Sequence, residues 1–593
     1  MTRHTYDMGV VGNCAYLAHI DTSARVRWLC LPRFDSPSVF GHLLDPQRGG
    51  ELGVSCAETF ARTQQYVLNT NVLQTTIQTP DGAFRVTDCA PRFEQHGRIY
   101  RPLMLIRKLE RLSGAPCIGI VCRPRGEYGE VAASVFQQSN HVRYDVGDHT
   151  LHLTTNVPVS YVVDERCFVL SETAYVILTW GVRLEARLAP TAEEFIDRTI
   201  EYWQSWIQGC AIGRFYQRDV IRSALALKLH QYEDTGAIIA AATAGLPEAP
   251  ATGRTWDYRY CWLRDAHFCL NALGRLGQFE EMRRFAKFIE NIARATGGRR
   301  YPPVVGIDGA LELPERTVAM TGYDGQGPVR VGNAAYEQVQ NDIYGQVIYA
   351  LLQLYIDERF PSVPTETSRS LIATLLRIMD KTLDEPDASL WEFRGIQTRH
   401  CYTALCHWVG AKSAVKIARA LGDDPMRREA VRLTARAERL IEACYDGQRG
   451  AYMQQPGSPF HDASTLQLIT LNYIDPMSER AARHLAAIER ELMDRGGLLH
   501  RYTHRDDFGI PATAFLVCSF WHVEALATMG RIEDALKELD VLRGYSNHLG
   551  LFSEDVDPST GSQWGNFPQA YSHVGLINAV LRISSKVEYP EFY

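Results

Sequence analysis

The sequence predicts a two-domain protein, in which an antiparallel β-sandwich precedes a domain built entirely of α-helical hairpins. Its 593 residues exceed what one hydrophobic core usually supports, so we expect two domains joined by a connector. Apolar residues alternate with polar ones up to about residue 190, and from Thr191 they recur at every third or fourth position. We therefore assign residues 1–190 to the sandwich, 191–213 to a helical linker and 214–593 to the helical domain.

The first part of the chain has the alternation and the turns of antiparallel strands. Residues 72–90 alternate around Pro80 and Gly82, where proline presets the backbone and glycine tolerates a positive φ, so we expect a hairpin. Residues 149–163 and 167–181 repeat the pattern, with β-branched and aromatic residues between polar breaks. Such strands are typical of a sandwich in which each sheet has one solvated face.

The second part repeats one design, in which a helix ends at a glycine and an acidic segment starts the next helix. Residues 272–281 and 525–534 both follow this design, and residues 420–430 are a looser copy. Recurring helical hairpins from residue 214 onward predict a closed ring or a solenoid of α/α units rather than a simple bundle. A closed ring gathers loops at one end, and we expect a pocket there.

Composition and charge exclude several classes of partner. The net charge of −7 provides no basic surface for nucleic acid or anionic lipid, and no segment has the roughly twenty apolar residues that a membrane span needs. Polar residues interrupt positions 1–20, so neither a secretory signal nor a membrane anchor is predicted. The 14 cysteines include no CxxC pair, which is typical of reduced thiols. We expect a cytoplasmic protein without disulfides, and the sequence leaves a homo-oligomer open.

Residues 254–268, RTWDYRYCWLRDAHF, concentrate aromatic and charged side chains. Arg264 offers donors beside the acceptor Asp265, which suits adjacent hydroxyls of a sugar. Trp256, Tyr260 and Trp262 offer flat faces to the C–H surface of the same sugar. Taken singly, Asp265 is equally well explained as a helix cap and Trp262 as a core residue. Their combination favours a carbohydrate pocket.

Two glutamates are candidates for the chemistry. Glu392 lies between Trp391 and Phe393, and desolvation by these rings would favour its protonated form, which keeps a proton available for donation. A salt bridge to Arg394 would oppose this effect, and a Glu–Arg pair at the start of a helix is the simpler alternative. Glu554 precedes a polar, glycine-rich loop that suits an active site, although acids near a turn are usually solvated. Hydrolysis of an acetal requires such a pair of carboxyls, one acid and one base.

Other motifs are weaker. In HCYTALCH, residues 400–407, no two ligands are three or four positions apart, so no metal site is predicted on a helix. The glycine-rich residues 322–333 match neither a phosphate loop nor a dinucleotide fingerprint. Residues 28–50 form a long, turn-rich excursion, from which Arg33 and Asp35 either reach a neighbouring pocket or lie on a surface loop.

Six segments together resemble bacterial members of glycoside hydrolase family 15, the glucoamylase and trehalase-like proteins. They are, in chain order, WLCLPRFDSPSVFGHLLD, WDYRYCWLRDA, GNAAYEQVQNDIYG, LWEFRG, FLVCSFWHVEALATMGR and GLFSEDVDPSTGSQWGNFPQAYSHVGLI. The resemblance implies a β-sandwich joined by a helical linker to a six-fold α/α toroid, with the pocket at the loop end of the toroid. It also implies an inverting hydrolase that releases glucose from the non-reducing end of a small α-glucoside or oligosaccharide, without metal or organic cofactor.

The same resemblance assigns roles to individual residues. By motif position, Glu392 is the general acid, Glu554 is the general base, and Arg264 and Asp265 hold the terminal glucose. Inversion implies that the two carboxyl groups stand roughly 6.5 to 9.5 Å apart. The candidate substrate-binding residues are Trp256, Tyr260, Trp262, Arg264, Asp265, Trp391, Arg33 and Asp35.

The segment after Glu392 departs from the family pattern, so the leaving group stays open among trehalose, maltose-type, isomaltose-type and modified glucosides. A disaccharide phosphorylase and a non-catalytic sugar-binding protein of the same fold are the alternatives. A carboxylate at Glu554 disfavours the phosphorylase, because it would repel the incoming phosphate. The presence of both glutamates disfavours a protein that only binds sugar.

Overall fold

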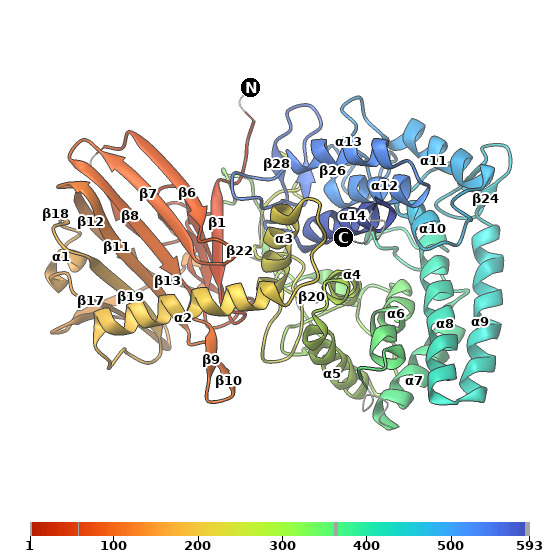
Figure 1. Ribbon diagram of the computed structural model, residues 1–593, viewed down its shortest axis with the longest axis horizontal. Helices are drawn as coiled ribbons and strands as arrows, with labels where there is room; N and C mark the ends of the chain where they lie inside the picture. The colour runs from red at the N-terminus through yellow and green to blue at the C-terminus, as the bar shows by residue number, and fades with distance from the viewer. Residues whose placement is uncertain (1–2, 57, 361–365, 588–593) are drawn as a thin grey trace, which may run out of the picture.

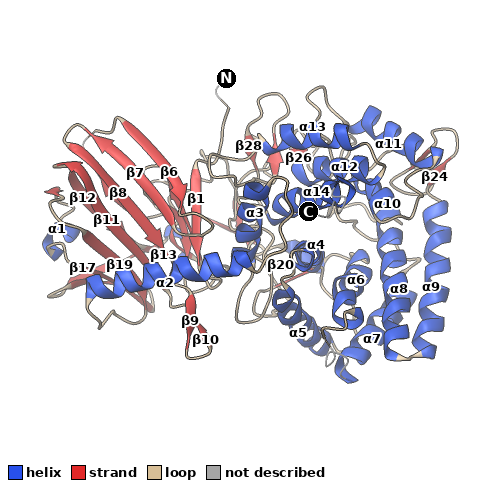
Figure 2. Cartoon of the chain, in the orientation of Figure 1, coloured by secondary structure: helices blue, strands red, loops and turns tan. Residues whose placement is uncertain are grey.

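The structure is a computed structural model that describes residues 3–56, 58–360 and 366–587. Figure 1 shows two domains side by side, with strands in the N-terminal part and helices in the C-terminal part. Figure 2 shows the same division by secondary structure, and the long helix α2 (Leu188–Gln208) runs along the strand-rich domain toward the helical one. The predicted fold class, an antiparallel sandwich followed by a helical domain, is confirmed.

Two antiparallel sheets form the N-terminal domain. The first has the order β1-β2-β3-β5-β12-β18, with β4 paired to β3, and the second has the order β15-β16-β17-β19-β11-β8-β7-β6. The strands of the first sheet are β1 (Met8–Gly12), β2 (Leu17–Asp21), β3 (Val26–Cys30), β4 (Ser38–Phe40), β5 (Glu51–Ser55), β12 (Cys117–Arg123) and β18 (Phe168–Val169). Those of the second are β6 (Ala61–Tyr66), β7 (Leu73–Thr79), β8 (Gly82–Cys89), β11 (Met104–Gly114), β15 (Ser134–Gln137), β16 (His141–Val146), β17 (His149–Thr155) and β19 (Ala174–Trp180). The small pairs β9 (Phe93–Gln95) with β10 (Arg98–Tyr100) and β13 (Arg125–Gly126) with β14 (Val131–Ala132) are separate.

The second sheet is covered on both faces. Along β11, Leu105 and Leu109 join the core between the two sheets, whereas Met104 and Ile106 belong to a second cluster. That cluster includes Ile196 of α2. Successive side chains of a strand point to opposite faces, so the three consecutive apolar residues Met104, Leu105 and Ile106 at the start of β11 are explained by burial on both sides.

The predicted hairpin over residues 72–90 is confirmed, because β7 pairs with β8 and Thr79 lies opposite Gly82. The prediction of strands over residues 149–163 is partly wrong. β17 ends at Thr155, and residues 159–163 form the short helix α1 (Val159–Val163). Pro158, with φ of −50°, stands where this helix begins, and Val159 and Val162 turn into the sandwich core. β-branched residues therefore fill a helix here because of tertiary packing.

Helices in contact with one another build the C-terminal domain. They are α3 (Gln217–His230), α4 (Leu263–Arg275), α5 (Phe279–Thr296), α6 (Asp342–Ile356), α7 (Glu366–Thr382), α8 (Cys401–Leu421), α9 (Asp424–Glu442), α10 (Gln467–Thr470), α11 (Glu479–Leu492), α12 (Leu516–Thr528), α13 (Ile532–Arg543) and α14 (Ala570–Val587), with the 3-10 turns η1 (Glu127–Gly129) in the first domain and η2 (Ala334–Glu337) and η3 (Ala463–Leu466) in this one. Short strands in the loops are β20 (Cys261–Trp262), β21 (Val304–Val305), β22 (Arg316–Val318), β23 (Val329–Val331), β24 (Tyr445–Asp446), β25 (Ala451–Tyr452), β26 (Ala514–Phe515), β27 (Asp555–Val556) and β28 (Gln563–Trp564).

The inner helices contact one another in a closed series. α4 contacts α6, α6 contacts α8, α12 contacts α14, and α14 returns to α4, while η3 and α10 lie between α8 and α12. Every residue of α12 is buried, whereas α13 buries only Ala535, Leu539 and Leu542, as expected for an inner and an outer helix. The sixfold count of hairpins stays a prediction.

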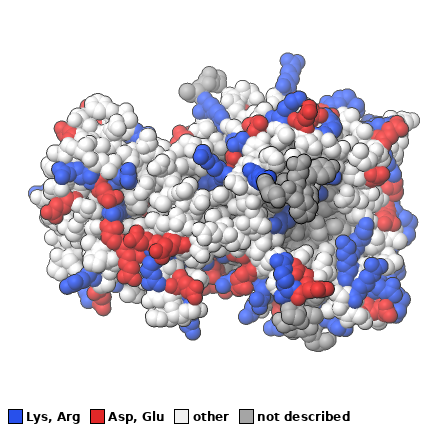
Figure 3. Space-filling view, viewed as in Figure 1, with Lys and Arg blue, Asp and Glu red and all other residues white. Residues whose placement is uncertain are grey.

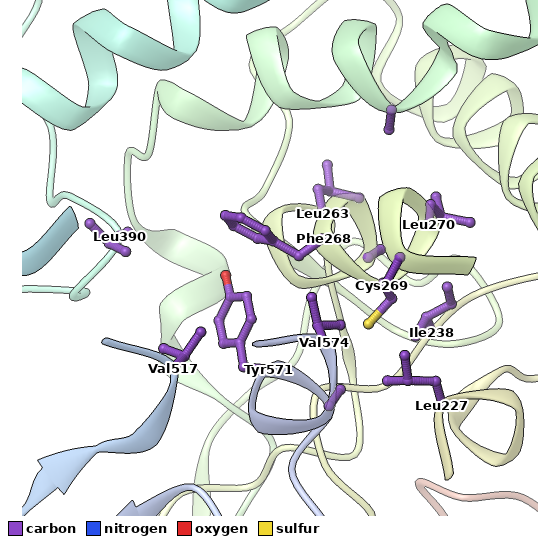
Figure 4. Close-up of a cluster of buried hydrophobic side chains, with 14 of the residues drawn as sticks. Leu227, Ile238, Leu263, Phe268, Cys269, Leu270, Leu390, Val517, Tyr571 and Val574 are labelled. Carbon is purple, nitrogen blue, oxygen red and sulfur yellow. The ribbon is translucent and has the colours of Figure 1, made fainter. Parts of the chain in front are cut away.

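The three predicted helix junctions are confirmed. Gly277, Gly422 and Gly530 have positive φ values of 84°, 64° and 81° and separate α4 from α5, α8 from α9, and α12 from α13. Figure 4 shows the core that the inner helices share, in which the rings of Phe268 and Tyr571 meet edge to face at 5.3 Å. This core lies directly beneath the loops that form the site.

The surface carries charged side chains of both signs. On the face that Figure 3 shows, acidic and basic side chains are interspersed, and acidic ones gather along α2. Within the described residues no helix has the length and apolar character to cross a bilayer. All 14 cysteines are free.

Candidate active site

A cavity of about 820 Å³, its open mouth included, lies at the loop end of the inner helices. The first turns of α4 and α14 contribute Arg264, Asp265 and Tyr571, and the remaining walls are loops together with the short elements β20, η2 and β26. Seven of the ten residues predicted for the site line this cavity: Trp256, Trp262, Arg264, Asp265, Trp391, Glu392 and Glu554. The expectation that loops converge on one pocket is thus met.

Glu392 lies in the loop that leads to α8 and has a positive φ of 60°, which is unusual for a residue with a side chain. Its Oε1 accepts hydrogen bonds from Trp262 Nε1 at 2.5 Å, from Arg264 Nη2 at 3.0 Å and from Gln340 Nε2 at 3.3 Å. Its backbone carbonyl accepts from Gln338 Nε2 at 3.2 Å. Its Oε2 has no hydrogen-bond partner among the described residues.

The ion pair of Glu392 differs from the one that the sequence suggested. Arg394 turns away to Glu315 at 3.1 Å, and its ring partner is Trp256, whose centroid lies 4.6 Å from the guanidinium carbon. Arg264, which is 3% exposed, takes its place beside Glu392. The positive φ at Glu392 turns the chain sharply, and neighbours in sequence therefore point to different partners.

Arg264 is held on several sides. Besides Glu392, it donates to Gln340 Oε1 at 2.5 Å and to Asp342 Oδ2 at 3.5 Å, and its Nε lies 4.0 Å from Asp265 Oδ2. Burial raises the pKa of Asp265 to about 7, although the charge of Arg264 lowers it. The helix-cap alternative does not hold for Asp265, because Trp262 is the N-cap of α4 and no side chain caps that end. A buried carboxyl and guanidinium at one wall suit polar recognition of a ligand.

Glu554 is 2% exposed and immediately precedes β27. Its Oε2 accepts from the backbone N–H of Asn566 at 3.3 Å. Burial first, and then the charges of Asp555 and Glu248, raise the pKa of Glu554 well above its usual range, while Arg501 lowers it. A carboxylate in this place is a strong proton acceptor once it is ionised.

The mouth of the cavity is lined by aromatic and charged groups. Trp256 Nε1 donates to Glu248 Oε1 at 2.9 Å, and its ring meets Phe508 edge to face at 5.2 Å. Arg254 donates to Asp506 Oδ1 at 2.6 Å, which fixes the loop that carries Phe508. Elsewhere in the cavity wall, Trp391 Nε1 donates to Asp462 Oδ2 at 2.9 Å.

Several of the residues that line this cavity were not predicted from the sequence. Glu248 and Arg501 line the cavity but lie in irregular segments without periodicity, so no local signal marks them. Arg254 also lines it and lies in the aromatic and charged segment 254–268, but it is not among the residues predicted to bind sugar. Gln340 and Tyr571 lie inside segments that carried the family resemblance, and that resemblance could have singled them out.

Three predicted residues do not share this cavity. Tyr260, Arg33 and Asp35 line a second cavity, which has no lining residue in common with the first. The ring of Tyr260 packs with Val304 and Leu313, and Arg33 pairs with Asp35. The expectation that they contact the same sugar as Arg264 is therefore corrected.

Residues 400–407 contain no metal site in the structure. His400, Cys401, Cys406 and His407 are buried on α8 or at its start, and burial lowers the pKa of His407 to about 4. Across the described ranges no group of three or more His, Cys, Asp or Glu residues could hold a metal ion.

Comparisons with known proteins cover most of both domains. The sequence profile of glycosyl hydrolases family 15 matches residues 214–538 and 529–581, and that of the trehalase-like N-terminal domain matches residues 3–188. The chain is 30% identical over 590 residues to a trehalase of Thermoplasma volcanium, covering 98% of this chain and 93% of the other. It is 31% identical over 617 residues to a trehalase of Mycolicibacterium smegmatis, with coverages of 97% and 91%. A bacterial glucoamylase crystallised with acarbose has a similar fold, with a TM-score of 0.69 at 14% identity over 98% of this chain and 95% of the other.

Proposed function

Because the chain belongs to glycosyl hydrolases family 15, we propose that it hydrolyses a small α-glucoside from the non-reducing end with inversion, and that trehalose is its substrate. The proposed catalytic domain comprises residues 214–593, preceded by a sandwich at 1–190 and a linker at 191–213. The fourteen free thiols support a cytoplasmic location.

One observation carries the proposal. Glu392 and Glu554 are 162 positions apart (554 minus 392) and come from different loops, yet both line one cavity. A general acid and a general base facing one sugar are what inverting hydrolysis needs, and the expected separation of their carboxyl groups is roughly 6.5 to 9.5 Å.

The proposed reaction assigns one proton to each glutamate. Glu392 donates a proton from Oε2 to the glycosidic oxygen as the bond between that oxygen and the anomeric carbon breaks. Glu554 accepts a proton from a water molecule whose oxygen attacks the anomeric carbon from the opposite face. Trp262, Arg264 and Gln340 all bind Oε1 of Glu392, which leaves Oε2 as the donor oxygen.

We assign the remaining predicted residues of this cavity to the sugar itself. Arg264 and Asp265 are placed to bind hydroxyls of the glucose that is cleaved, and Trp256, Trp262 and Trp391 offer rings to its C–H faces. Trehalose is favoured as substrate because two proteins named trehalase align with this chain from end to end.

Hydrolysis of trehalose followed by proton NMR from the first seconds tests the proposal. Inversion gives one β-glucose from the attacked unit and one α-glucose from the leaving unit, whereas retention gives only α-glucose. Glu392→Gln and Glu554→Gln should each lower kcat by at least about a hundredfold with little loss of binding.

Three outcomes would contradict the proposal. Dependence on added phosphate would indicate a phosphorylase, and binding of trehalose without turnover would indicate a sugar-binding protein. Near-normal turnover in either glutamine variant would remove the catalytic role of that glutamate.

A further inference from the structure

The second cavity lies where the two domains meet. It measures about 710 Å³ with its open mouth included, and domain junctions often hold small-molecule sites. The sandwich contributes Arg33, Asp35 and Tyr128 to its lining, and the helical domain contributes Tyr260 and Asp308 among others.

The walls of this cavity are fixed by contacts across the junction. Arg33 donates through Nε and Nη2 to Asp35 at 3.0 and 3.1 Å and through Nη1 to Asp308 at 2.9 Å. The buried Arg259 donates to the hydroxyl of Tyr128 at 3.0 Å and to the carbonyl of Ser36 at 2.8 Å. Lining groups that are held in place before a ligand arrives lose little entropy on binding.

Several polar groups at the cavity are left for a ligand. The ring of Tyr260 is buried, at 8% exposure, but its hydroxyl has no hydrogen-bond partner among the described residues. Arg316 and Glu312 also line the cavity, and within the described chain neither side chain forms a hydrogen bond or an ion pair, although the guanidinium of Arg316 lies 5.7 Å from the ring centroid of Tyr128. The cavity therefore offers a phenol, a guanidinium and a carboxylate at once.

The balance of charge selects the class of ligand. Three carboxylates, those of Asp35, Asp308 and Glu312, face two guanidiniums, those of Arg33 and Arg316. A phosphate or carboxylate ligand would meet an excess of negative charge, and a cation would meet both arginines. A neutral ligand with many hydroxyls satisfies donors and acceptors together, and Tyr260 at the cavity wall can contact its C–H surface.

We propose that this cavity is a second saccharide-binding site, which takes a neutral mono- or disaccharide without cleaving it. The choice of trehalose as its ligand rests on the proposed function, whereas the class of ligand rests on the cavity alone. Neither Glu392 nor Glu554 lines the cavity, so binding here has no general acid or base beside it.

Equilibrium dialysis of radiolabelled trehalose against the full-length Glu392→Gln chain counts the bound molecules, and we expect two per chain at saturation. Ala310→Trp places a large ring in the second cavity and should reduce the count to one. Ala61→Trp, at an exposed position on the edge strand β6, is the matched control and should leave it at two. A double variant with smaller changes, Glu312→Gln with Arg316→Gln, should raise the Kd of trehalose at the second site about tenfold and leave the active site unchanged.

Arg264→Ala in the same background separates this proposal from the proposed function, because it should remove the active-site molecule and leave the other. Two bound trehalose molecules per chain in Ala310→Trp would overturn the second site while the proposed function stands. The same conclusion would follow if the Glu392→Gln chain bound one molecule and Arg264→Ala abolished that binding. A count that Ala310→Trp lowers and Arg264→Ala leaves unchanged would support the second site and contradict the proposed function.

Discussion

Glu554 is surrounded by acids that determine when it can accept a proton. Burial is the largest influence, and Asp555 and Glu248 add negative charge, so the pKa of Glu554 is raised well above its usual range. A general base must be ionised before it accepts a proton. We therefore expect the rate to fall on the acid side of the pH profile, at a pH that these neighbours set.

Glu248→Gln tests this dependence. Glutamine keeps an oxygen for the hydrogen bond from Trp256 Nε1 and removes one negative charge, while Arg501 remains beside Glu554. The acid limb of kcat/KM against pH should move to lower pH by up to about one unit. Glu185→Gln, an exposed pair partner of Arg183 on the sandwich, serves as control. An unmoved limb, or one that moves to higher pH, would show that Glu248 does not tune the base.

The sequence predicts those site residues that carry a local signature. The pairs Trp391 with Glu392 and Arg264 with Asp265 are visible because an acid stands beside an aromatic or a basic residue. The bond between Arg264 and Glu392 is not visible, since it joins residues 128 positions apart. Glu248 has no distinguishing neighbour at all, and only the folded loops bring it to Glu554.

At the scale of elements, helices α6 and α8 approach each other closely through two glycines. A Cβ on Gly345 would meet the carbonyl oxygen of Cys406 at 2.0 Å, and one on Gly410 would meet Cα of Gly345 at 2.3 Å. Backbone atoms form both contacts, so no side chain can move aside. This crossing fixes α8, whose start follows the loop that carries Glu392.

Gly410→Ala should therefore destabilise the fold. Forcing one methyl group into this crossing should lower the free energy of unfolding by about 1 to 3 kcal/mol, visible as a lower Tm in calorimetry. Gly447→Ala is the control, because a Cβ there meets nothing within 4 Å. Equal Tm values for the two variants would show that α6 and α8 can move apart without loss of stability.

Element boundaries follow from the sequence where a single residue forces them. The glycines at 277, 422 and 530 stop helices because they adopt positive φ, and this is readable in advance. Helix α1 is different, since its valines favour a strand and only burial against the sandwich core makes them helical. Local preference and tertiary packing agree in the first case and conflict in the second.

At the scale of the whole molecule, buried ion pairs join the two domains. Arg92, which follows β8, donates to Glu233 Oε2 at 2.8 Å, and Glu233 lies in the helical part, 141 positions later. Arg284 reaches the other oxygen of Glu233 at 2.6 Å, and Lys228 lies 3.9 Å away. No sequence pattern marks this junction, because its partners are far apart and their charges are common.

Glu233 makes the stability of this junction depend on pH in a defined direction. Burial raises its pKa, but the charges of Arg92, Lys228 and Arg284 outweigh burial and lower the pKa from 4.5 to about 2. A carboxyl whose pKa is lower in the folded state than in the unfolded state stabilises the fold at every pH above the unfolded-state pKa. That contribution disappears as the pH falls from about 4.5 through about 2. The shift corresponds to about 3 kcal/mol at neutral pH.

Urea unfolding of the native chain and of Glu233→Gln, at several pH values between 3 and 7, measures this contribution as a difference. The native chain should be more stable by about 3 kcal/mol near pH 7, and the difference should shrink as the pH falls from about 4.5 toward 3, because the unfolded chain then binds a proton at Glu233 that the folded chain, in which its pKa is about 2, does not yet bind. Glu185→Gln, whose side chain is 71% exposed, should show almost no difference at any pH. A difference that stays constant from pH 7 to pH 3 would mean that the charge of Glu233 does not hold the domains together, and that its effect comes from packing alone.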